Sequence, residues 1–596
     1  MALEILQVGS EHREVRAGDA ISRWRYLSLH LLVGAAVMIT GAIEGRYGKS
    51  DLFGDDISYL DLANMIRVGD WRAALNPLWS IGYPMLLSVV RHLFPLTPRG
   101  EVDAAIWLNL SIYLFAWIGF LWLVRSMGAV LEGDIADQRP RRLSPFLLIC
   151  AGCIFVSVQT GIGRVSTLGP DLLVTCIFFF ASGLALKAFS RSDARGAALW
   201  GAVLGIGVFS KAIFFSLAGI FFLIAIWLKA RRHHFAPIYR AAGMFLLFVI
   251  PYGVGLSWAL GRLTFGEAGA LNYAFHVNHL PHWMGWQGGP KELGSPIHPV
   301  RLLSTHPPVF AFGEPFHVTY PPQFNMVYWY EGYHRFFSFR NTADAFLENV
   351  RSTKYVFQEI IPVVLVILLC FCVAFWPRRS NRDAVKPVLS AWVLYLPSIL
   401  GCLTLLLVHI EGRYVAGFVC VLAMAPFLAL DRWKGPVRST LRFAALMLLV
   451  AATVFNSAER LHAATRLAVE RVDPHSGGQW AVAEYLQQMG LKAGDKVASV
   501  SAKNNLRCTW AYGAGLHVVA ALGNDAYDPE NQVEDLHLFF DNPSVQEQVL
   551  QMFREQGAVA AVATDIPFNV SSPGWQHVPG SKTWVYVLEP AISVGR

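Results

Sequence analysis

The sequence predicts a polytopic α-helical membrane protein with a small soluble α/β domain at its C-terminal end. Three observations lead to this fold class. Of the 596 residues, 54% are hydrophobic and 15% are charged, whereas charged residues make up about a quarter of an ordinary soluble domain. Long apolar runs recur between residues 26 and 456. After residue 456 the pattern changes to short apolar strands and amphipathic helices, which is typical of an α/β domain.

About eleven apolar segments are expected to cross the bilayer, and most approach the length of about 17–25 residues that a spanning helix takes. They are expected at about residues 26–43, 103–124, 145–161, 168–189, 197–211, 213–229, 240–261, 356–376, 388–409, 413–430 and 439–456. Four arginines between residues 13 and 25 precede the first segment, and this positive charge places the N-terminus in the cytoplasm. The polar start shows no cleavable signal peptide, so the first segment is expected to be an uncleaved anchor.

Two stretches decide which loops face which side of the membrane. The apolar stretch from Tyr83 to Pro95 is too short for a full span and is expected to be re-entrant or interfacial. The run from Arg195 to Lys229 is expected to hold two short spans that meet near Lys211. One long tilted helix is the alternative, and it would invert the topology of everything downstream. With the first stretch re-entrant and two spans in the second, basic loops near residues 125–142, 187–195, 229–240, 378–382 and 432–438 all fall on the cytoplasmic side.

The same topology places two loops and the C-terminal domain outside the cell. The membrane domain is expected to cover residues 1–456, with outer loops at 44–102 and 263–355, and the soluble domain residues 457–596. Within the soluble domain we expect helices at 478–489 and 543–556, and strands at 496–500, near Val518, at 558–564 and at 584–588. No Gly-rich phosphate loop is present in it, so its expected role is structural or the binding of an acceptor.

An acidic helix start lies in the first outer loop. Asp55 and Asp56 precede apolar residues at helical spacing that end at Gly69, and Tyr59 follows one turn later. Either carboxylate could simply cap the helix by accepting backbone N–H bonds. The alternative is that the pair belongs to an active site.

Further ionisable or polar residues gather at the outer ends of the predicted spans. Together with the two aspartates they are Arg164, Asp171, Lys211, His409, Glu411, Arg413 and Tyr414. A charge at membrane depth is costly and usually marks a site or a pathway. Each has a structural explanation of its own, since Asp171 can cap its helix, Lys211 can reach the interface and Arg413 can pair with Glu411. Their shared position predicts one polar site on the outer face.

Four short motifs resemble the C-type integral-membrane glycosyltransferases, which have the GT-C fold and include the protein mannosyltransferases and aminoarabinose-lipid A transferases. The motifs are Asp55-Asp56-x-x-Tyr59 with a later Gly-Asp-Trp and Gly-Tyr-Pro, Gly169-Pro170-Asp171, Gly201-x-x-x-Gly205 ending at Lys211, and Glu411-x-Arg413-Tyr414. The family pattern usually reads Asp-Glu-x-x-Tyr, so this chain departs from it at Asp56. The resemblance covers most of residues 27–430 and is thinnest between 263 and 400.

The resemblance implies a glycosyltransferase that moves a sugar from a polyprenyl-phosphate donor to an acceptor hydroxyl on the outer face of a bacterial cytoplasmic membrane. Asp55 would be the general base. Lys211 and Arg413, with Tyr414 and Arg164, would hold the donor phosphate, because fixed cations stabilise the charge that the leaving phosphate gains.

One base and a single displacement would invert the anomeric centre. A retaining route would use Asp56 or Asp171 as a nucleophile; otherwise these two carboxylates position the acceptor or the base. Tyr59, His409 and Glu411 are expected to position the acceptor or the sugar. The implied partners are the lipid-linked donor, membrane lipids and a lipid, polysaccharide or protein acceptor, and the charge pattern gives no indication of nucleic-acid binding.

No cofactor is expected to be required. A divalent cation bridging the three aspartates is the alternative, since carboxylates suit hard cations. Three histidines of the long outer loop recur at every third residue: His276, His279 and His282. They could bind zinc, but Pro281 breaks the helix that would align them, so an interfacial loop is the preferred interpretation.

Aromatic residues between Tyr320 and Phe339, including Tyr328 and Trp329, could stack on a sugar. Because Trp and Tyr also gather at membrane interfaces whatever the function, an interfacial belt is the preferred interpretation. Two other function classes stay open. A transporter or flippase of lipid-linked intermediates should show polar residues at mid-membrane and related halves, and a non-catalytic binder of polyprenyl phosphate would keep the charges without the chemistry.

Overall fold

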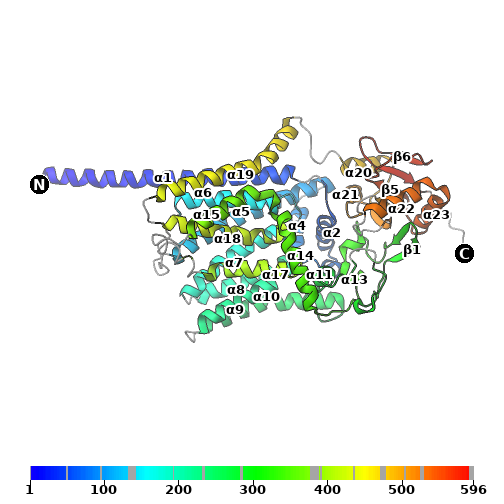
Figure 1. Cartoon of the computed structure of the whole chain (residues 1–596), viewed down its shortest axis with the longest axis horizontal. Coiled ribbons are helices and arrows are strands. Elements are labelled where there is room, and N and C mark those ends of the chain that lie inside the picture. The colour runs from blue at the N-terminus through cyan, green and yellow to red at the C-terminus, as the bar shows by residue number, and fades with distance from the viewer. Residues whose placement is uncertain are drawn as a thin grey trace.

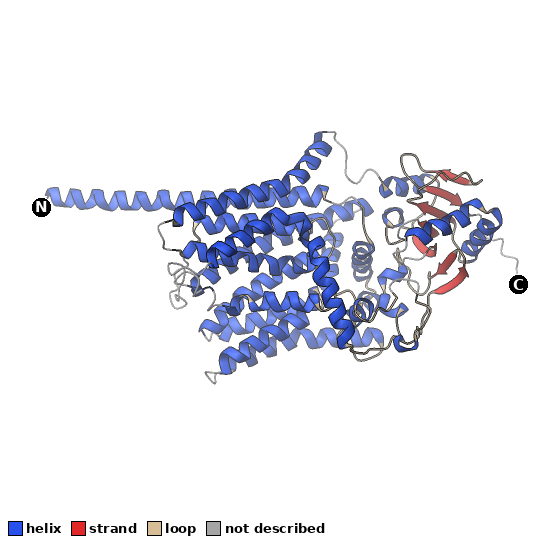
Figure 2. Cartoon of the chain, in the orientation of Figure 1, coloured by secondary structure: helices blue, strands red, loops and turns tan. Residues whose placement is uncertain are grey.

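The computed structural model consists of a helical bundle with a sheet-containing module at one end (Figures 1 and 2). It describes residues 2–48, 51–93, 97–131, 142–191, 194–230, 235–281, 286–375, 388, 392–433, 437–469, 478–501, 505–523 and 529–588. We call the end of the bundle that bears the sheet the module end.

Seven helices within the described residues are long and apolar enough to cross a membrane, and four shorter apolar helices lie among them. The long ones are α1 (Ala2–Tyr47, apolar from Trp24), α5 (Pro98–Leu131), α6 (Pro145–Val158) with the π-helical η1 (Gln159–Gly163), α10 (Ala236–Leu260), α14 (Phe339–Phe357) continued by η4 (Gln358–Ile360) and α15 (Ile361–Phe375), α18 (Gly412–Arg432) and α19 (Arg438–Val469). The shorter ones are α7 (Asp171–Arg191), α8 (Ala194–Ser210), α9 (Ile213–Ala230) and α17 (Leu396–Leu406). A helix lies at each predicted span, and the chain is a multi-pass membrane protein.

The two stretches that decide the topology, at 83–95 and 195–229, form short helices. Helix α4 (Gly82–Leu93) has 12 residues, which amounts to about 18 Å of helix and is too short to cross; Pro95 lies outside the described residues. The helix is interrupted at Lys211, between the end of α8 and the start of α9. The alternative of one long tilted helix is therefore wrong. Each of the predicted basic loops lies at least partly outside the described residues, at 132–141, 192–193, 231–234, 376–387 and 434–436.

The module contains a seven-stranded sheet in the order β1-β2-β4-β3-β5-β7-β6. Strand β3 (Lys496–Ser501) is parallel to β4 (His517–Leu522) and β5 (Ala560–Thr564), while β7 (Trp584–Val587) and β6 (Trp575–His577) are antiparallel. Helices α20 (Gln479–Gln488), α21 (Thr509–Ala514), α22 (Pro529–Asp541) and α23 (Pro543–Glu555) accompany it. The predicted α/β class of the tail is confirmed, and α21, α22 and β6 are elements that the sequence pattern did not predict.

The sheet is not built from the tail alone. Strands β1 (Arg301–Thr305) and β2 (Pro308–Ala311) belong to the long outer loop, and β2 pairs antiparallel with β4, with Phe310 opposite Ala521. Helix α19 also runs to Val469, past the predicted boundary at 456. The division at 456/457 stays a prediction, but the outer loop and the tail both contribute strands to one sheet.

The rest of the outer loop consists of short elements near the module end. They are α11 (Ala268–His276), η3 (Lys291–Leu293), α12 (Pro321–Phe324) and α13 (Met326–Trp329), while α3 (Trp71–Ala74) lies in the first outer loop and η6 (Trp392–Leu394) precedes α17.

Helix α2 (Gly54–Val68) is held by the outer loop and by the module. The backbone N–H and the hydroxyl of Thr319 both donate to the buried carboxylate of Asp61, at 3.0 and 3.1 Å. The N–H of Leu52 donates to Thr509 Oγ1 at 2.8 Å. A Cβ on Gly54 would lie 3.0 Å from Leu506. Contacts distant in sequence therefore position the helix that starts with the two aspartates.

The glycine spacing on α8 has a packing reason. A Cβ on Gly201 would overlap the backbone carbonyl of Ala241 in α10, and one on Gly205 would lie 2.8 Å from Phe248 Cβ. The two helices therefore approach each other closely along this face, and this approach positions the end of α8 and the adjacent Lys211.

Replacing Gly201 by Ala is expected to destabilise the protein by about 1–3 kcal/mol, because α8 and α10 must move apart to admit the methyl group. The matched control is Gly219→Ala in α9, where no atom lies within 4 Å of the added Cβ and the higher helix propensity of Ala should stabilise the protein by up to about 1 kcal/mol. Thermal unfolding of both variants in detergent measures the difference. Equal unfolding temperatures for the two variants would contradict this packing.

The contact between Asp61 and Thr319 predicts a pH dependence. Burial raises the pKa of Asp61 to about 7, although hydrogen bonds from Thr319 act in the opposite direction. Between about pH 4 and pH 7 the folded chain then holds a proton that the unfolded chain has released, so this carboxylate makes the fold less stable as the pH rises through that window.

Asp61→Asn is expected to remove this contribution, of at most roughly 1.4 kcal/mol per pH unit. Unfolding temperatures measured from pH 4.5 to 7.5 should fall less steeply with rising pH in the variant than in the wild type. Asp70→Asn, at an exposed helix cap, is the control. Parallel pH profiles for the wild type and both variants would show that Asp61 does not take up the proton.

Candidate active site

A cavity of about 470 Å³ lies at the module end of the bundle. Its charged lining residues come from four separate parts of the chain: Asp55 and Asp56 of α2, Arg164 after η1, Glu359 of η4, and Glu411 and Arg413 at the start of α18. Phe53, Thr167, Tyr355 and Ile410 are among the remaining lining residues. The cavity is therefore a meeting point of charged groups that lie far apart in the sequence.

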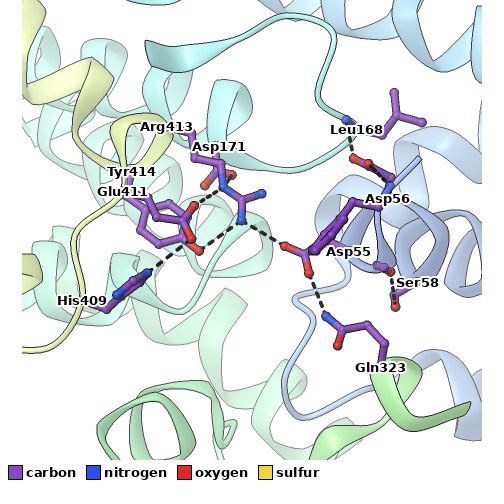
Figure 3. Close-up of polar contacts among 12 residues, drawn as sticks. Asp55, Asp56, Ser58, Leu168, Asp171, Gln323, His409, Glu411, Arg413 and Tyr414 are labelled. Carbon is purple, nitrogen blue, oxygen red and sulfur yellow. Dashed lines mark hydrogen bonds and ion pairs between the residues drawn. The ribbon is translucent and has the colours of Figure 1, made fainter. Parts of the chain in front are cut away.

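Arg413 is the centre of the charged cluster. Its Nη2 lies 3.0 Å from Asp55 Oδ2, and its Nε lies 2.6 Å from Glu411 Oε2 and 3.7 Å from Asp171 Oδ2. Figure 3 shows the guanidinium between Asp55 on one side and the other two carboxylates on the other. Asp55 and Arg413 are 358 positions apart in sequence, so helix packing alone brings them together.

A second cation joins the cluster through Asp171. Asp171 is the first residue of α7, and its Oδ1 lies 2.5 Å from Lys211 Nζ. The same ammonium lies 3.7 Å from the centre of the Tyr414 ring, which is a cation–π distance. Asp171 thus bridges Lys211 and Arg413. The structure brings these residues together at one site, as the sequence analysis predicted.

The other oxygen of Asp55 is held by a residue that the sequence analysis missed. Gln323 Nε2 of α12 donates to Asp55 Oδ1 at 2.8 Å. Gln323 is 2% exposed, and its Oε1 is buried without a hydrogen-bond partner among the described residues. A single amide in a loop 268 positions away carries no sequence signal. The side chain of Asp55 is therefore fixed from two sides.

Asp56 has a different role from Asp55. It is 1% exposed, its Oδ2 accepts the N–H of Phe53 at 2.7 Å, and its Oδ1 accepts the N–H of Leu168 at 2.9 Å. Figure 3 shows it pointing away from Arg413, toward Leu168. The capping interpretation of the acidic pair thus describes Asp56, which also ties the turn before α7 to α2.

Glu411 contacts both Arg413 and His409. His409 Nε2 donates to its Oε1 at 3.3 Å, and the His409 ring stacks on His276 with ring centres 4.0 Å apart. Burial by itself would raise the pKa of Glu411, but the hydrogen bond from His409 and the charge of Arg413 outweigh it and hold the pKa below its usual range. Glu411 is therefore an anion throughout the physiological pH range.

Tyr59 is buried close to the cluster. Burial, and then the negative charges of Asp171 and Asp55, raise the pKa of Tyr59 well above its usual value. Its ring packs edge-on against Trp79 and Tyr83. The phenol therefore stays protonated and can act only as a neutral hydrogen-bonding group.

Arg164 pairs with a partner that was not predicted. Its Nη2 contacts Glu359 Oε1, and Glu359 Oε2 accepts from Arg460 Nη2 of α19 at 2.9 Å. Glu359 could have been found, because a lone carboxylate at the head of an apolar span is the signal that singled out Asp171 and Glu411. Arg460 follows the predicted span at 439–456 by one turn and carries the same kind of signal.

Tyr328 and Trp329 lie elsewhere in the outer loop. Tyr328 stacks on His298 with ring centres 4.2 Å apart, and the Trp329 indole donates to the carbonyl of Pro321 at 3.1 Å. Neither lines the cavity. Both side chains pack within the loop that presents Gln323 to Asp55.

The described residues do not fit a metal ion. Within them, no three His, Cys, Asp or Glu side chains lie close enough to hold one. Both oxygens of Asp56 accept backbone N–H groups, while Asp55 and Asp171 pair with cations. Of the three outer-loop histidines, His276 stacks on His409, His279 lies three residues beyond the end of α11 with a positive φ of 54°, and His282 lies outside the described residues.

Comparisons with known proteins support the fold. No protein-family model and no curated protein matches the sequence. Among solved structures, ArnT from Cupriavidus metallidurans bound to undecaprenyl phosphate matches with a TM-score of 0.50 and 13% identity, over 95% of this chain and 99% of that one. The archaeal oligosaccharyltransferase AglB from Archaeoglobus fulgidus, in complex with an inhibitory peptide and a dolichol-phosphate, matches at 0.48 and 13%, over 91% and 70%. The similarity to ArnT confirms the GT-C fold that the motifs predicted.

The structural role of Asp56 makes a testable prediction. Asp56→Ala leaves the N–H groups of Phe53 and Leu168 without their acceptor and should destabilise the protein by about 2–4 kcal/mol. Asp70→Ala, which removes an exposed helix cap, is the matched control and should cost only about 0.5–1 kcal/mol. Thermal unfolding in detergent compares them, and equal losses would show that Asp56 does not anchor the turn before α7.

Proposed function

We propose that this GT-C-fold protein is a glycosyltransferase that moves a sugar from a polyprenyl-phosphate donor to a hydroxyl of an envelope lipid, polysaccharide or protein. One observation supports the proposal most: the carboxylate of Asp55 and the cations Arg413 and Lys211 meet in one cluster beside a cavity at the end of a membrane bundle. The matching ArnT structure holds undecaprenyl phosphate, and the proposal extends this class of ligand to the present chain.

Arg413 and Lys211 are the proposed ligands of the donor phosphate. When the anomeric C–O bond breaks, the electron pair stays on the phosphate oxygen, and fixed cations lower the energy of that developing charge. Arg413 offers a planar fork of N–H donors, and Lys211 offers a point charge. Tyr414 supports both, since its ring lies under Lys211 and its hydroxyl accepts from Arg413 Nη2 at 3.4 Å.

Asp55 is the proposed general base. The acceptor hydroxyl must lose its proton as its oxygen bonds to the anomeric carbon, and a carboxylate within hydrogen-bond reach can take that proton. Arg413 and Gln323 occupy both oxygens of Asp55 in this structure. A phosphate entering beside Arg413 competes with Asp55 for the guanidinium, and the displaced carboxylate oxygen then becomes available to the acceptor.

A single displacement with one base supports inversion at the anomeric centre. A retaining route needs a second carboxylate as nucleophile. Asp56 is unsuited to this role because backbone N–H groups hold both of its oxygens, and Asp171 is paired with Lys211 and Arg413. No step of the proposed reaction runs through a metal ion.

The proposed site of action is the outer face of a bacterial cytoplasmic membrane, with the N-terminus in the cytoplasm and the sheet module outside. The positive charge before the first span and the short length of α4 support this orientation. A transporter or flippase would instead hold its ligand near mid-membrane, whereas the charged cluster described above lies at the module end.

Asp55→Asn tests the proposal. Membranes that contain the protein are incubated with radiolabelled polyprenyl-phosphate sugars and a cell-envelope extract, and label transferred to the extract is counted. We expect the variant to lose about 10²–10⁴-fold in transfer rate, because an amide cannot accept the proton, while it still binds the donor lipid.

Asp70→Asn, in the same outer loop but exposed and outside the cavity, is the matched control and should transfer label at the wild-type rate. Transfer by Asp55→Asn at that same rate would refute the assignment of the base. Failure of the wild type to transfer any of the labelled sugars, with unaltered binding or movement of the lipid in the variant, would favour a transporter or a non-catalytic binder.

A further inference from the structure

A second set of paired charges, Arg164, Glu359 and Arg460, lies at the same cavity. Arg164 and Glu359 line it, with side chains 46% and 32% exposed, and Arg460, 27% exposed, pairs with Glu359. Arg460 also donates to Thr160 Oγ1 at 3.1 Å. One carboxylate is therefore shared between two arginines, and the group carries one net positive charge.

The backbone holds Arg164 in a costly conformation. Its φ is 59°, in the left-handed region that residues other than Gly rarely adopt. Such strain persists only where surrounding contacts enforce it, and it concentrates at functional sites. The enforcing contacts are present, since the carboxylate of Glu44 accepts the N–H groups of Val165 and Ser166, and Asp56 accepts that of Leu168.

Arg164 lies beside the cluster around Arg413. A Cβ on Gly412 would lie 2.9 Å from Ile162 Cβ and 3.1 Å from the carbonyl oxygen of Ile162. Gly412 immediately precedes Arg413, and Ile162 is two residues before Arg164. The two segments are thus in backbone contact where they enter the cavity, and both arginines line it.

The charges of the two groups are complementary. Around Arg413, the carboxylates of Asp55, Asp171 and Glu411 pair with two cations among the described residues, Arg413 and Lys211, and Glu411 also contacts the ring of His409. Counted with a neutral imidazole, this cluster carries one net negative charge. An entering donor phosphate adds further negative charge to a partly buried place, where like charges repel strongly. A cation that can turn toward the ligand is needed nearby, and Arg164 is half exposed and lines the same cavity.

We propose that Arg164 forms a second anion subsite, which binds a negatively charged group of the substrates other than the phosphate assigned to Arg413 and Lys211. This inference rests on the proposed function. The ligand is a phosphate or carboxylate, and two sources share that chemistry: a second phosphate on the lipid-linked donor, or an anionic group on the acceptor.

Glu359 and Arg460 have defined roles in this subsite. Glu359 is the counter-ion that occupies Arg164 until the substrate anion replaces it, so it competes with the ligand. Arg460 is a positioning residue, because it holds Glu359 by the other carboxylate oxygen and retains it when Arg164 turns away. Removing the arginine and removing the glutamate should therefore change anion binding in opposite directions.

The test uses purified full-length protein in detergent, with undecaprenyl phosphate and undecaprenyl diphosphate as probes, and the variants Arg164→Gln and Glu359→Gln. Transfer assays with increasing amounts of envelope extract give the half-saturating amount of acceptor. The control is Arg351→Gln, which removes an exposed charge of α14. Unfolding temperatures show that each variant is folded.

If the second anion belongs to the donor, the diphosphate binds the wild type about tenfold more tightly than the monophosphate, as a charge-assisted hydrogen bond would provide. Arg164→Gln then abolishes that preference, and Glu359→Gln increases it. If the anion belongs to the acceptor, the two lipids bind alike, while Arg164→Gln raises the half-saturating amount of extract about tenfold and Glu359→Gln lowers it.

Either pattern of opposite changes supports the subsite. Parallel losses in both variants would show that the ion pair only supports the fold, and values equal to those of Arg351→Gln would show that Arg164 meets no ligand; each overturns the inference and leaves the proposed function intact. If the wild type binds neither lipid and transfers no label, the proposed function fails, and this inference falls with it.

Discussion

The ion pairs of Arg413 are the interaction on which the rest of the structure depends. A guanidinium that is largely buried at the end of a helix bundle is stable only if carboxylates surround it, because leaving it unpaired costs several kcal/mol. Asp55 of α2, Asp171 of α7 and Glu411 before α18 supply those carboxylates. These three segments lie far apart in the sequence of the membrane domain, and all three contact the same guanidinium. That guanidinium lines the cavity.

The surrounding structure fixes this point in two ways. Asp56 and Glu44 hold the turn that precedes α7, through backbone N–H groups of residues 165, 166 and 168. The outer loop and the sheet module hold α2, through Gln323, Thr319 and Thr509. Because the module shares its sheet with the outer loop, the soluble part of the chain belongs to the framework of the site.

The fold was predictable where a structural requirement restricts neighbouring residues, as the apolar interior of a membrane restricts the residues of a spanning helix. Apolar runs of membrane length and isolated charges beside them identified the helices and Asp171, Lys211 and Arg413. The residue pattern alone did not distinguish Asp55 from Asp56, and only the family resemblance made Asp55 the expected base, because neighbouring residues of a first helical turn differ only in the direction they face. The contact of Gln323 with Asp55, the pairing of Glu359 with Arg164, and the pairing of β2 with β4 join residues about 200 to 270 positions apart, and no local pattern records such contacts.

A cryo-EM structure of the protein in lipid nanodiscs with undecaprenyl phosphate would test the central claim most directly. The account predicts that the phosphate lies within about 3 Å of the Arg413 guanidinium and the Lys211 ammonium, and that Asp55 has separated from Arg413 and faces the cavity. A phosphate bound elsewhere, with Arg413 still paired to Asp55 and Glu411, would contradict it.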